Sequence, residues 1–419
     1  MIEVINQVNR LTMKRFLILF LMVLFSCREK KPTQERTVPE ISAPGTFGYD
    51  LAFISKYKEV IVLGGKTSPA KVILVKDYQG RVMTSTATGT MGNSYGWINY
   101  KLIESGETKP HMNPVGGEDR FWLGPEGGQF ALYFKKGDPF DFDHWQTPRV
   151  IDTESFEIVS SDSLHAVFKK SVSVTNYQGF QFSIDIQREI KLLKETDILR
   201  EFGISTEILK AVAYQSTNSV TNTGKEDWTR KNGLLSIWIL GMFNPSDKTV
   251  IALPHHVSGE ANMITDNYFG SIPSNRITKS DSLLLLKADG KYRGKVGVAP
   301  SIAKNMVGSY DAEKHILTLV KFDLDPHGAY VNSKWEKQKE PFKGDAVNSY
   351  NDGPIADGSQ LGPFYELESS SPAVALKRGE TFTHRHITMH LEGDEEELNK
   401  VAEKTLGTGL KRIRDSFSR

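Results

Sequence analysis

Residues 364–372, FYELESSSP, carry two carboxylates at a spacing that suits acid–base chemistry. Side chains alternate between the two faces of a strand, so Glu366 and Glu368 would share one face, about 7 Å apart. When two carboxylates are buried this close together, the pKa of one of them rises, and such a carboxyl can act as a general acid or base. The alternative is a solvent-exposed face with scattered acids.

A second candidate stretch, residues 116–134 (GGEDRFWLGPEGGQFALYF), combines acids, an arginine, aromatics and paired glycines. The glycine pairs predict turns, and the alternation of Phe130, Leu132 and Phe134 with other apolar residues predicts a strand buried on both faces. Charges and a tryptophan between tight turns are costly to bury without partners. We therefore expect a polar cleft with an aromatic wall here, whereas the alternative is a surface hairpin with an ion pair. The candidate binding residues of this stretch are Arg120, Trp122, Glu126 and Gln129.

Histidines supply a third set of candidates. His384, His386 and His390 alternate along THRHITMH and would lie on one face of a strand. They are either a metal cluster or an exposed polar face, and we expect the exposed face because metal sites seldom draw three ligands from one straight strand. We expect no bound metal. His144, in FDFDHWQTP, lies between acids and Trp145 and is a candidate contact for a ligand.

The composition excludes several function classes. The chain of 419 residues has 52 Lys+Arg and 51 Asp+Glu, which gives none of the positive surplus that nucleic-acid binding requires. The sequence has no phosphate loop, no dinucleotide fingerprint, no Gly-x-Ser-x-Gly and no His-Glu-x-x-His. We therefore expect no nucleic-acid partner, no cofactor, and neither a serine hydrolase nor a zinc protease.

The N-terminus has the pattern of a lipoprotein signal peptide. Lys14 and Arg15 precede the apolar run FLILFLMVLF at 16–25, which is too short to cross a bilayer comfortably. Cys27, the single cysteine, follows directly in LFSC, which resembles a bacterial lipobox. We expect residues 1–27 to be the signal peptide with a lipidated Cys27, and the polar, Pro-containing residues 28–46 to be a flexible tether. The protein would then be anchored in the cell envelope, on the outer membrane or facing the periplasm.

The elements that must position the candidate residues are mostly strands. Short apolar runs separated by turn signals continue from residue 47 almost to the C-terminus, with no alternation of strands and helices. This pattern predicts one all-β domain, a large antiparallel sandwich, over residues 47–410. Helical periodicity appears in EEELNKVAEKTL, residues 395–406, which predicts a short C-terminal helix before Gly407. Residues 411–419 would form a basic tail.

Several segments resemble a known family. Residues 366–391, ELESSSPAVALKRGETFTHRHITMHL, are similar to the closing segment of galactose mutarotase (aldose 1-epimerase) proteins. GGEDRFWLGPEGGQF looks like a segment of mutarotase-like families of unknown activity. NYFGSIP, GKYRGKVG, GSYD, YVNSKWEKQ and GDAVNSYNDGP complete the likeness, which covers residues 47 to about 409. The sequence therefore resembles uncharacterised bacterial lipoproteins with a galactose mutarotase-like domain.

The resemblance implies a β-supersandwich with a concave, sugar-binding face. Mutarotases use a glutamate as general base and a histidine as general acid, and the glutamate role carries over to Glu368, with Glu366 as second choice. The family's histidine has no counterpart in residues 218–238. Arg120, Trp122 and Glu126 would then position the sugar, with Trp145 as a further stacking ring and Lys295 as a secondary contact.

Three functions follow as hypotheses. The first is a carbohydrate-binding or carbohydrate-active lipoprotein that transfers a proton at the anomeric centre of an aldose, in the manner of an epimerase. The second is a glycan-binding module without catalysis. The third is a glycoside-cleaving enzyme that uses two carboxylates from Glu126, Glu366 and Glu368.

Overall fold

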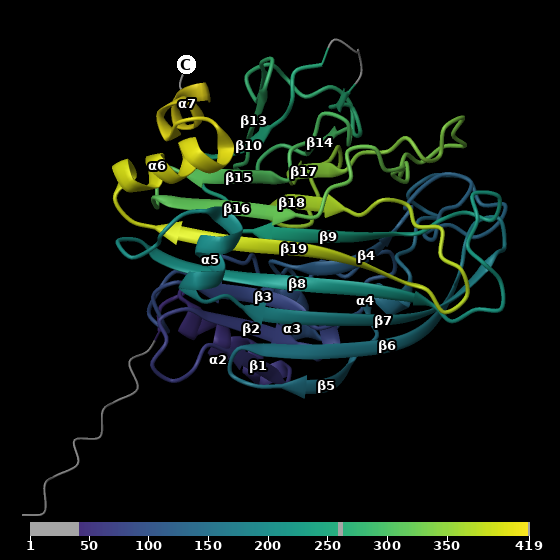
Figure 1. Ribbon diagram of the computed structural model, residues 1–419, viewed down its shortest axis with the longest axis horizontal. Coiled ribbons are helices and arrows are strands. Elements are labelled where there is room, and N and C mark those ends of the chain that lie inside the picture. The colour runs from purple at the N-terminus through teal and green to yellow at the C-terminus, as the bar shows by residue number, and fades with distance from the viewer. Residues whose placement is uncertain (1–41, 259–262, 418–419) are drawn as a thin grey trace, which may run out of the picture. The chain divides into compact units, whose positions relative to one another are not determined.

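Antiparallel strands dominate the computed structural model, which describes residues 42–258 and 263–417. They form a sheet of ten strands, a sheet of six and a sheet of three (Figure 1). The predicted large antiparallel all-β fold is therefore confirmed. The expected signal peptide, Cys27 and tether residues 28–41 lie outside the described residues. Within the described part of the chain, no helix is long and apolar enough to cross a membrane.

The ten-stranded sheet contains the longest strands. In β7, apolar residues alternate with polar ones, so that Phe182, Ile184 and Ile186 are buried while the residues between them are more exposed. This alternation gives the sheet one buried and one wetter face. The strand order is β12 (Ile277–Lys279), β13 (Leu283–Lys287), β10 (Thr249–Pro254), β15 (Met306–Asp311), β16 (Ile316–Phe322), β19 (Thr381–Glu392), β8 (Lys210–Asn222), β7 (Gln181–Leu192), β6 (His165–Thr175) and β5 (Glu157–Ser161).

The six-stranded sheet carries the candidate site. Its strand order is β11 (Ile264–Thr265), β14 (Gly294–Val298), β17 (Val347–Asn351), β18 (Tyr365–Ser370), β9 (Ser236–Phe243) and β4 (Arg120–Gly124). On one face, Tyr365, Leu367 and Ser369 meet the ten-stranded sheet, where Tyr365 and Ser369 hydrogen-bond to residues of β15 and β19. The other face, at the alternate positions, presents Glu366 and Glu368, as the strand alternation predicts.

The three-stranded sheet comprises β1 (Val60–Leu63), β2 (Lys71–Val75) and β3 (Arg81–Thr86), with the 3-10 turn η2 (Lys76–Tyr78) before β3. Helix α2 (Phe47–Tyr57) precedes it and is capped by Thr46, whose side chain accepts from the backbone N–H of Tyr49. The expectation that strands begin at residue 47 is therefore wrong. The hydroxyl cap at Thr46 and the buried Phe47 and Ile54 make this segment helical.

Further helices lie between and after the strands. They are α3 (Tyr100–Ser105), α4 (Arg149–Asp152), α5 (Glu195–Phe202), α6 (Glu395–Leu406) and α7 (Leu410–Arg414), followed by the turn η3 (Asp415–Phe417). The C-terminal helix is confirmed at its predicted bounds: Asp394 caps its start and Gly407, in the left-handed region, ends it. In the segment expected as a basic tail, Ile413 of α7 is fully buried.

The histidines of β19 are not on an exposed face. His384, His386 and His390 are fully buried between the two larger sheets. His384 and His386 share the hydroxyl of Ser369, at 2.9 and 2.8 Å. The expectation failed because β19 lies in the middle of the ten-stranded sheet, where even a polar face is covered. The His390 Nε2 lies 3.0 Å from Glu118 Oε2, so these histidines satisfy buried polar groups instead of facing solvent.

Two features of residues 116–134 differ from expectation. Residues 125–134 form turns and bends and no strand, although Phe130, Leu132 and Phe134 are buried as predicted. Their alternation with other apolar residues reflects burial in an irregular segment. Periodicity alone cannot distinguish such a segment from a buried strand. Asp119 points away from the cleft face and pairs with Arg188 of β7 at 2.6 Å, with both side chains fully buried.

Candidate functional site

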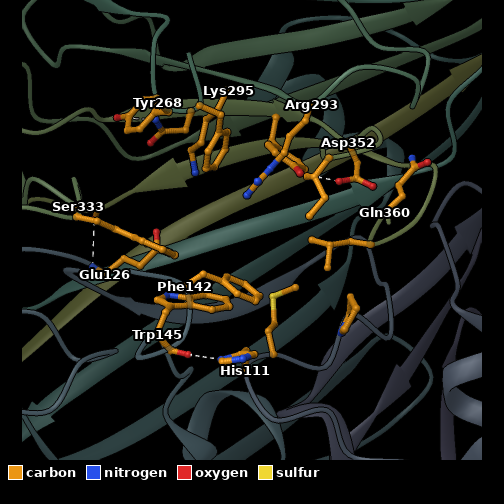
Figure 2. A pocket seen from close by; sticks show the side chains of 18 of the residues that line it. His111, Glu126, Phe142, Trp145, Tyr268, Arg293, Lys295, Ser333, Asp352 and Gln360 are labelled. Atoms are coloured by element: carbon orange, nitrogen blue, oxygen red, sulfur yellow. Dashed lines mark hydrogen bonds between the residues drawn. The ribbon is translucent and has the colours of Figure 1, made fainter. Parts of the chain in front are cut away.

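A cleft of about 1380 Å³ lies over the outer face of the six-stranded sheet. Side chains at alternate positions of β9, β14, β17 and β18 form its floor, and residues from the connecting loops form its walls (Figure 2). The strand register explains why the floor is polar: Lys295 on β14 is opposite Tyr350 on β17, which is opposite Glu366 on β18. Residues from segments far apart in sequence thus share one face.

An ion pair is buried beneath one part of the floor. The Arg120 Nη2 donates to Glu366 Oε1 at 2.7 Å, and the two side chains are nearly inaccessible. Burial raises the pKa of Glu366 and the nearby Glu368 adds to this rise, whereas Arg120 opposes it. The guanidinium also lies 4.4 Å from the centre of the Trp122 ring. Arg120 is therefore committed to Glu366 and Trp122, and does not line the cleft.

A second charged pair reaches the cleft. Lys295 Nζ lies 3.1 Å from Glu368 Oε2, and the same oxygen accepts from the indole N–H of Trp238 at 2.9 Å. The other carboxylate oxygen, Oε1, has no hydrogen-bond partner among the described residues. Burial alone would lower the pKa of Lys295, but Glu368, Glu126 and Glu366 together leave it raised. Lys295 and Trp238 line the cleft and cover Glu368, which is fully buried.

Glu126, unlike Glu366 and Glu368, lines the cleft directly. It follows β4 in a turn, and its backbone N–H donates to the hydroxyl of Ser333 (Figure 2). Burial raises the pKa of Glu126, Lys295 opposes the rise, and Glu368 adds to it. A half-buried carboxyl whose pKa is raised in this way is a candidate general base for a bound ligand.

Aromatic rings form one wall of the cleft. The ring centroids of Trp145 and Trp335 are 5.7 Å apart, those of His111 and Phe142 4.5 Å apart, and those of Phe142 and Trp145 6.1 Å apart. Figure 2 shows His111, Phe142 and Trp145 together on one side of the cleft, across from Lys295 and Arg293. Phe142 is 58% exposed, so its ring is available for a ligand to stack on.

The opposite wall is polar. Asp345 accepts from the hydroxyl of Tyr268, and Asp352 accepts from the hydroxyl of Tyr350 at 2.6 Å. Burial raises the pKa of both aspartates, and the tyrosine hydroxyls oppose the rise. These carboxyls are already hydrogen-bonded within the protein. They shape the cleft rather than offer a free acid.

Of the residues predicted as a site, three line the cleft together: Glu126, Trp145 and Lys295. Glu366, Glu368, Arg120 and Trp122 lie beneath them. Gln129 is occupied elsewhere, because its side chain donates to the carbonyl of Gln338 and accepts from the backbone N–H of that residue. His144 is exposed, bonds to Asp141 at 2.6 Å and does not line the cleft.

Sequence reasoning missed several lining residues, notably Phe142, Tyr268, Trp335 and Asp345. Two of them stand in segments that carried the family likeness, Tyr268 in NYFGSIP and Trp335 in YVNSKWEKQ. The sequence signal that could have identified them is an aromatic residue next to charged and turn-forming residues. Within the described ranges, no group of three or more His, Cys, Asp or Glu side chains is placed to hold a metal ion.

A model described as a family of unknown function (DUF6786) matches residues 45–417. No sequence among the curated proteins matches the chain. Similar solved structures include the Slr1438 protein from Synechocystis sp. PCC 6803, a galactose mutarotase-like protein from Lactobacillus casei and a galactose mutarotase related enzyme from Lactobacillus acidophilus. They are 11%, 11% and 10% identical, with TM-scores of 0.49, 0.46 and 0.44. Each match covers 80% of this chain and 96%, 100% and 98% of the respective relative. At these similarities, the function has to be inferred from the cleft itself.

Proposed function

The chain belongs to DUF6786, a family of unknown function, and we propose that it binds a carbohydrate in the cleft and transfers a proton at its anomeric centre. The observation that carries this proposal is the position of Glu126 and Lys295 in the same cleft as a wall of aromatic rings. Galactose mutarotase-like proteins among the similar solved structures agree with a carbohydrate-related function but do not carry the argument.

Carbohydrate fits the mixed character of the cleft. The C–H faces of a sugar ring stack on aromatic rings such as Trp145 and Phe142, and its hydroxyls bind charged and amide groups. Pockets for small ligands usually measure roughly 300–1,000 Å³. A cleft of about 1380 Å³ has room for more than a single sugar unit.

The proposed reaction is the interconversion of anomers. Glu126 takes the proton of the anomeric hydroxyl, the bond between the anomeric carbon and the ring oxygen breaks, and the ring oxygen receives a proton. Lys295 supplies that proton: its ammonium hydrogen-bonds to the ring oxygen as negative charge develops there, transfers a proton to it and is left as a neutral amine. Ring closure on the other face of the carbonyl reverses both proton transfers. Lys295 thus takes the part for which no matching histidine exists in the sequence.

Glu368, the first choice for the base from sequence, has a different part in this proposal. Its carboxylate is fully buried and is separated from the cleft by Lys295 and Trp238. It keeps the ammonium of Lys295 charged and in place, so it is a positioning residue. Glu126, in contrast to Glu368, lines the cleft and can touch a bound sugar.

The test is anomer exchange measured by NMR on a panel of aldoses and oligosaccharides, together with ligand-induced thermal shifts. Glu126→Gln should lower the exchange rate by about 10²–10⁴-fold, as expected for loss of a general base, and leave the thermal shift intact. The exposed Glu157→Gln on β5 is the matched control. Thermal shifts without any acceleration would favour glycan binding alone, and release of reducing ends would favour two-carboxylate hydrolysis. No thermal shift with any carbohydrate would refute the proposal.

We also propose that the protein is a lipoprotein of the cell envelope, anchored to a membrane through lipidated Cys27. The support is the order of the basic pair at 14–15, the apolar run at 16–25 and the cysteine directly after it.

A further inference from the structure

Arg293 is a cation of the cleft that the proposed reaction does not use. It stands directly before β14, two residues from Lys295, and it lines the cleft. Its guanidinium carbon lies 3.9 Å from the centre of the Phe269 ring, and Figure 2 shows the side chain directed into the cleft. The ring of Phe269 is itself 46% exposed. The guanidinium of Arg293 and the ring of Phe269 thus form a flat surface on the cleft wall that is partly shielded from water.

The charge of Arg293 is not matched by the protein. Across residues 42–258 and 263–417, Arg293 has neither a hydrogen bond nor an ion pair, although its side chain is half-buried. Two other cations at this face are matched, Arg120 by Glu366 at 2.7 Å and Lys295 by Glu368 at 3.1 Å. A partly desolvated guanidinium without an anion is unfavourable, and stacking on one ring offsets only part of that cost.

Asp352, a carboxylate of the same wall, is already engaged. Its Oδ1 accepts from the hydroxyl of Tyr350 at 2.6 Å, and its Oδ2 accepts from the backbone N–H of Gly362 at 2.9 Å. Asp345, a half-buried carboxyl of this wall, accepts from the hydroxyl of Tyr268. Neither carboxylate forms an ion pair with Arg293, so an acidic group of a ligand would supply the partner that the described residues do not.

We propose that the carbohydrate of this cleft is an acidic oligosaccharide whose carboxylate or sulfate group binds Arg293, an inference that rests on the proposed function. A guanidinium presents a rigid fork of N–H donors that matches two oxygens of such a group, which an ammonium cannot reproduce. The platform on Phe269 fixes the plane of the fork. Because the aromatic wall lies across the cleft from Arg293, one oligosaccharide can stack on that wall and present its acidic group to Arg293.

The test compares three oligosaccharides of equal length by calorimetry: a neutral one, one with uronate units and one with sulfate esters. The wild type should bind one acidic ligand roughly 10–100-fold more tightly than the neutral one, as charge-assisted hydrogen bonds allow. Arg293→Gln should abolish this preference and leave affinity for the neutral ligand unchanged, and Arg293→Lys should restore only part of it. Lys101→Gln, which removes an exposed cation from the same cleft, is the matched control and should preserve the preference.

The acidic oligosaccharide whose affinity falls in Arg293→Gln identifies the bound group as a uronate or a sulfate ester. Either result supports the proposal. Equal affinity for neutral and acidic ligands, or a preference that survives in Arg293→Gln, would overturn it while the proposed carbohydrate function stands. If none of the three oligosaccharides binds, by calorimetry or in the thermal-shift panel, both the acidic-ligand proposal and the proposed carbohydrate function are refuted.

Discussion

Lys295 Nζ lies 3.1 Å from Glu368 Oε2, and the two side chains are 13% and 0% exposed. The indole N–H of Trp238 donates to the same oxygen at 2.9 Å. The carboxylate thus lies below the cleft while the ammonium reaches into it. This relationship makes Glu368 a partner of Lys295 rather than of the ligand.

Removing both members of this pair should cost less than the sum of the costs of removing each one alone. Glu368→Gln leaves a buried ammonium without its counter-charge, and loss of one partner of a buried pair typically costs about 3–5 kcal/mol. Lys295→Met leaves the Glu368 carboxylate unpaired in the same way. We expect the double variant to be less destabilised than the sum of the single variants, as measured by urea unfolding. Additive free energies of unfolding would contradict the pairing.

The pH dependence of anomer exchange should follow Glu126. Its carboxylate is the active form, and burial raises its pKa above the ordinary value of 4.5. The rate should therefore fall as the pH falls through this raised pKa. Because Lys295 opposes the rise, Lys295→Met should move the acid limb of the pH–rate profile to higher pH as well as lower the rate. An acid limb that stays in place in Lys295→Met would show that Glu126 is not the titrating base.

Strand alternation was sufficient to predict that Glu366 and Glu368 share a face, because that relationship is local. It could not bring Lys295 to Glu368, since β14 and β18 are separated in the sheet by β17 and their pairing depends on contacts distant in sequence. For the same reason, the sequence could not rank Glu126 above Glu368 as the candidate general base. Only the tertiary structure determines which carboxyl is covered by Trp238.

Burial was harder to predict for polar residues than for apolar ones. His384 and His386 have the alternating pattern of a wet strand face, yet β19 pairs with β8 and β16 on its two sides and is covered by the six-stranded sheet. One nitrogen of each ring has a partner in that buried position, because the hydroxyl of Ser369 lies 2.9 Å from His384 Nε2 and 2.8 Å from His386 Nδ1. A sequence pattern records the polarity of a residue but not whether a distant partner compensates for it.

Phe142 should contribute to carbohydrate binding and not to stability. Its ring is 58% exposed on the aromatic wall, so Phe142→Ala removes a stacking surface without opening a cavity in the core. We expect affinity for a bound oligosaccharide to fall by about 1 kcal/mol, roughly fivefold, with an unchanged unfolding midpoint. Ile208→Ala, at a 72% exposed residue outside the cleft lining, is the control. Equal affinities of Phe142→Ala and wild type would exclude the wall from the binding surface.

Lipidation at Cys27 can be tested directly in cells. A labelled fatty acid should enter the wild-type protein and be absent from Cys27→Ser, because the thiol of the single cysteine is the attachment point for the lipid. The wild type should fractionate with membranes, and the variant should not. Label in both proteins, or in neither, would refute the lipoprotein proposal without affecting the cleft.

The buried histidines should make the protein sensitive to mild acid. Burial lowers the pKa of His386 from 6.5 to about 4 and that of His384 to about 3. Below pH 6.5 the unfolded chain binds protons that the folded chain does not, so the free energy of unfolding should fall as the pH falls from 6.5 to about 4. For His386 the shift corresponds to roughly 3 kcal/mol. Urea unfolding at pH 7 and pH 4.5 measures this loss.

His386→Gln should reduce the difference in unfolding free energy between the two pH values, because a glutamine can still bond to Ser369 but cannot take up a proton. The exposed His327→Gln serves as the control and should leave the difference unchanged. The variant is informative even if it is less stable at both pH values, since the prediction concerns the slope with pH and not the absolute stability. An unaltered slope in His386→Gln would mean that carboxylates, and not this histidine, govern the acid sensitivity of the sandwich.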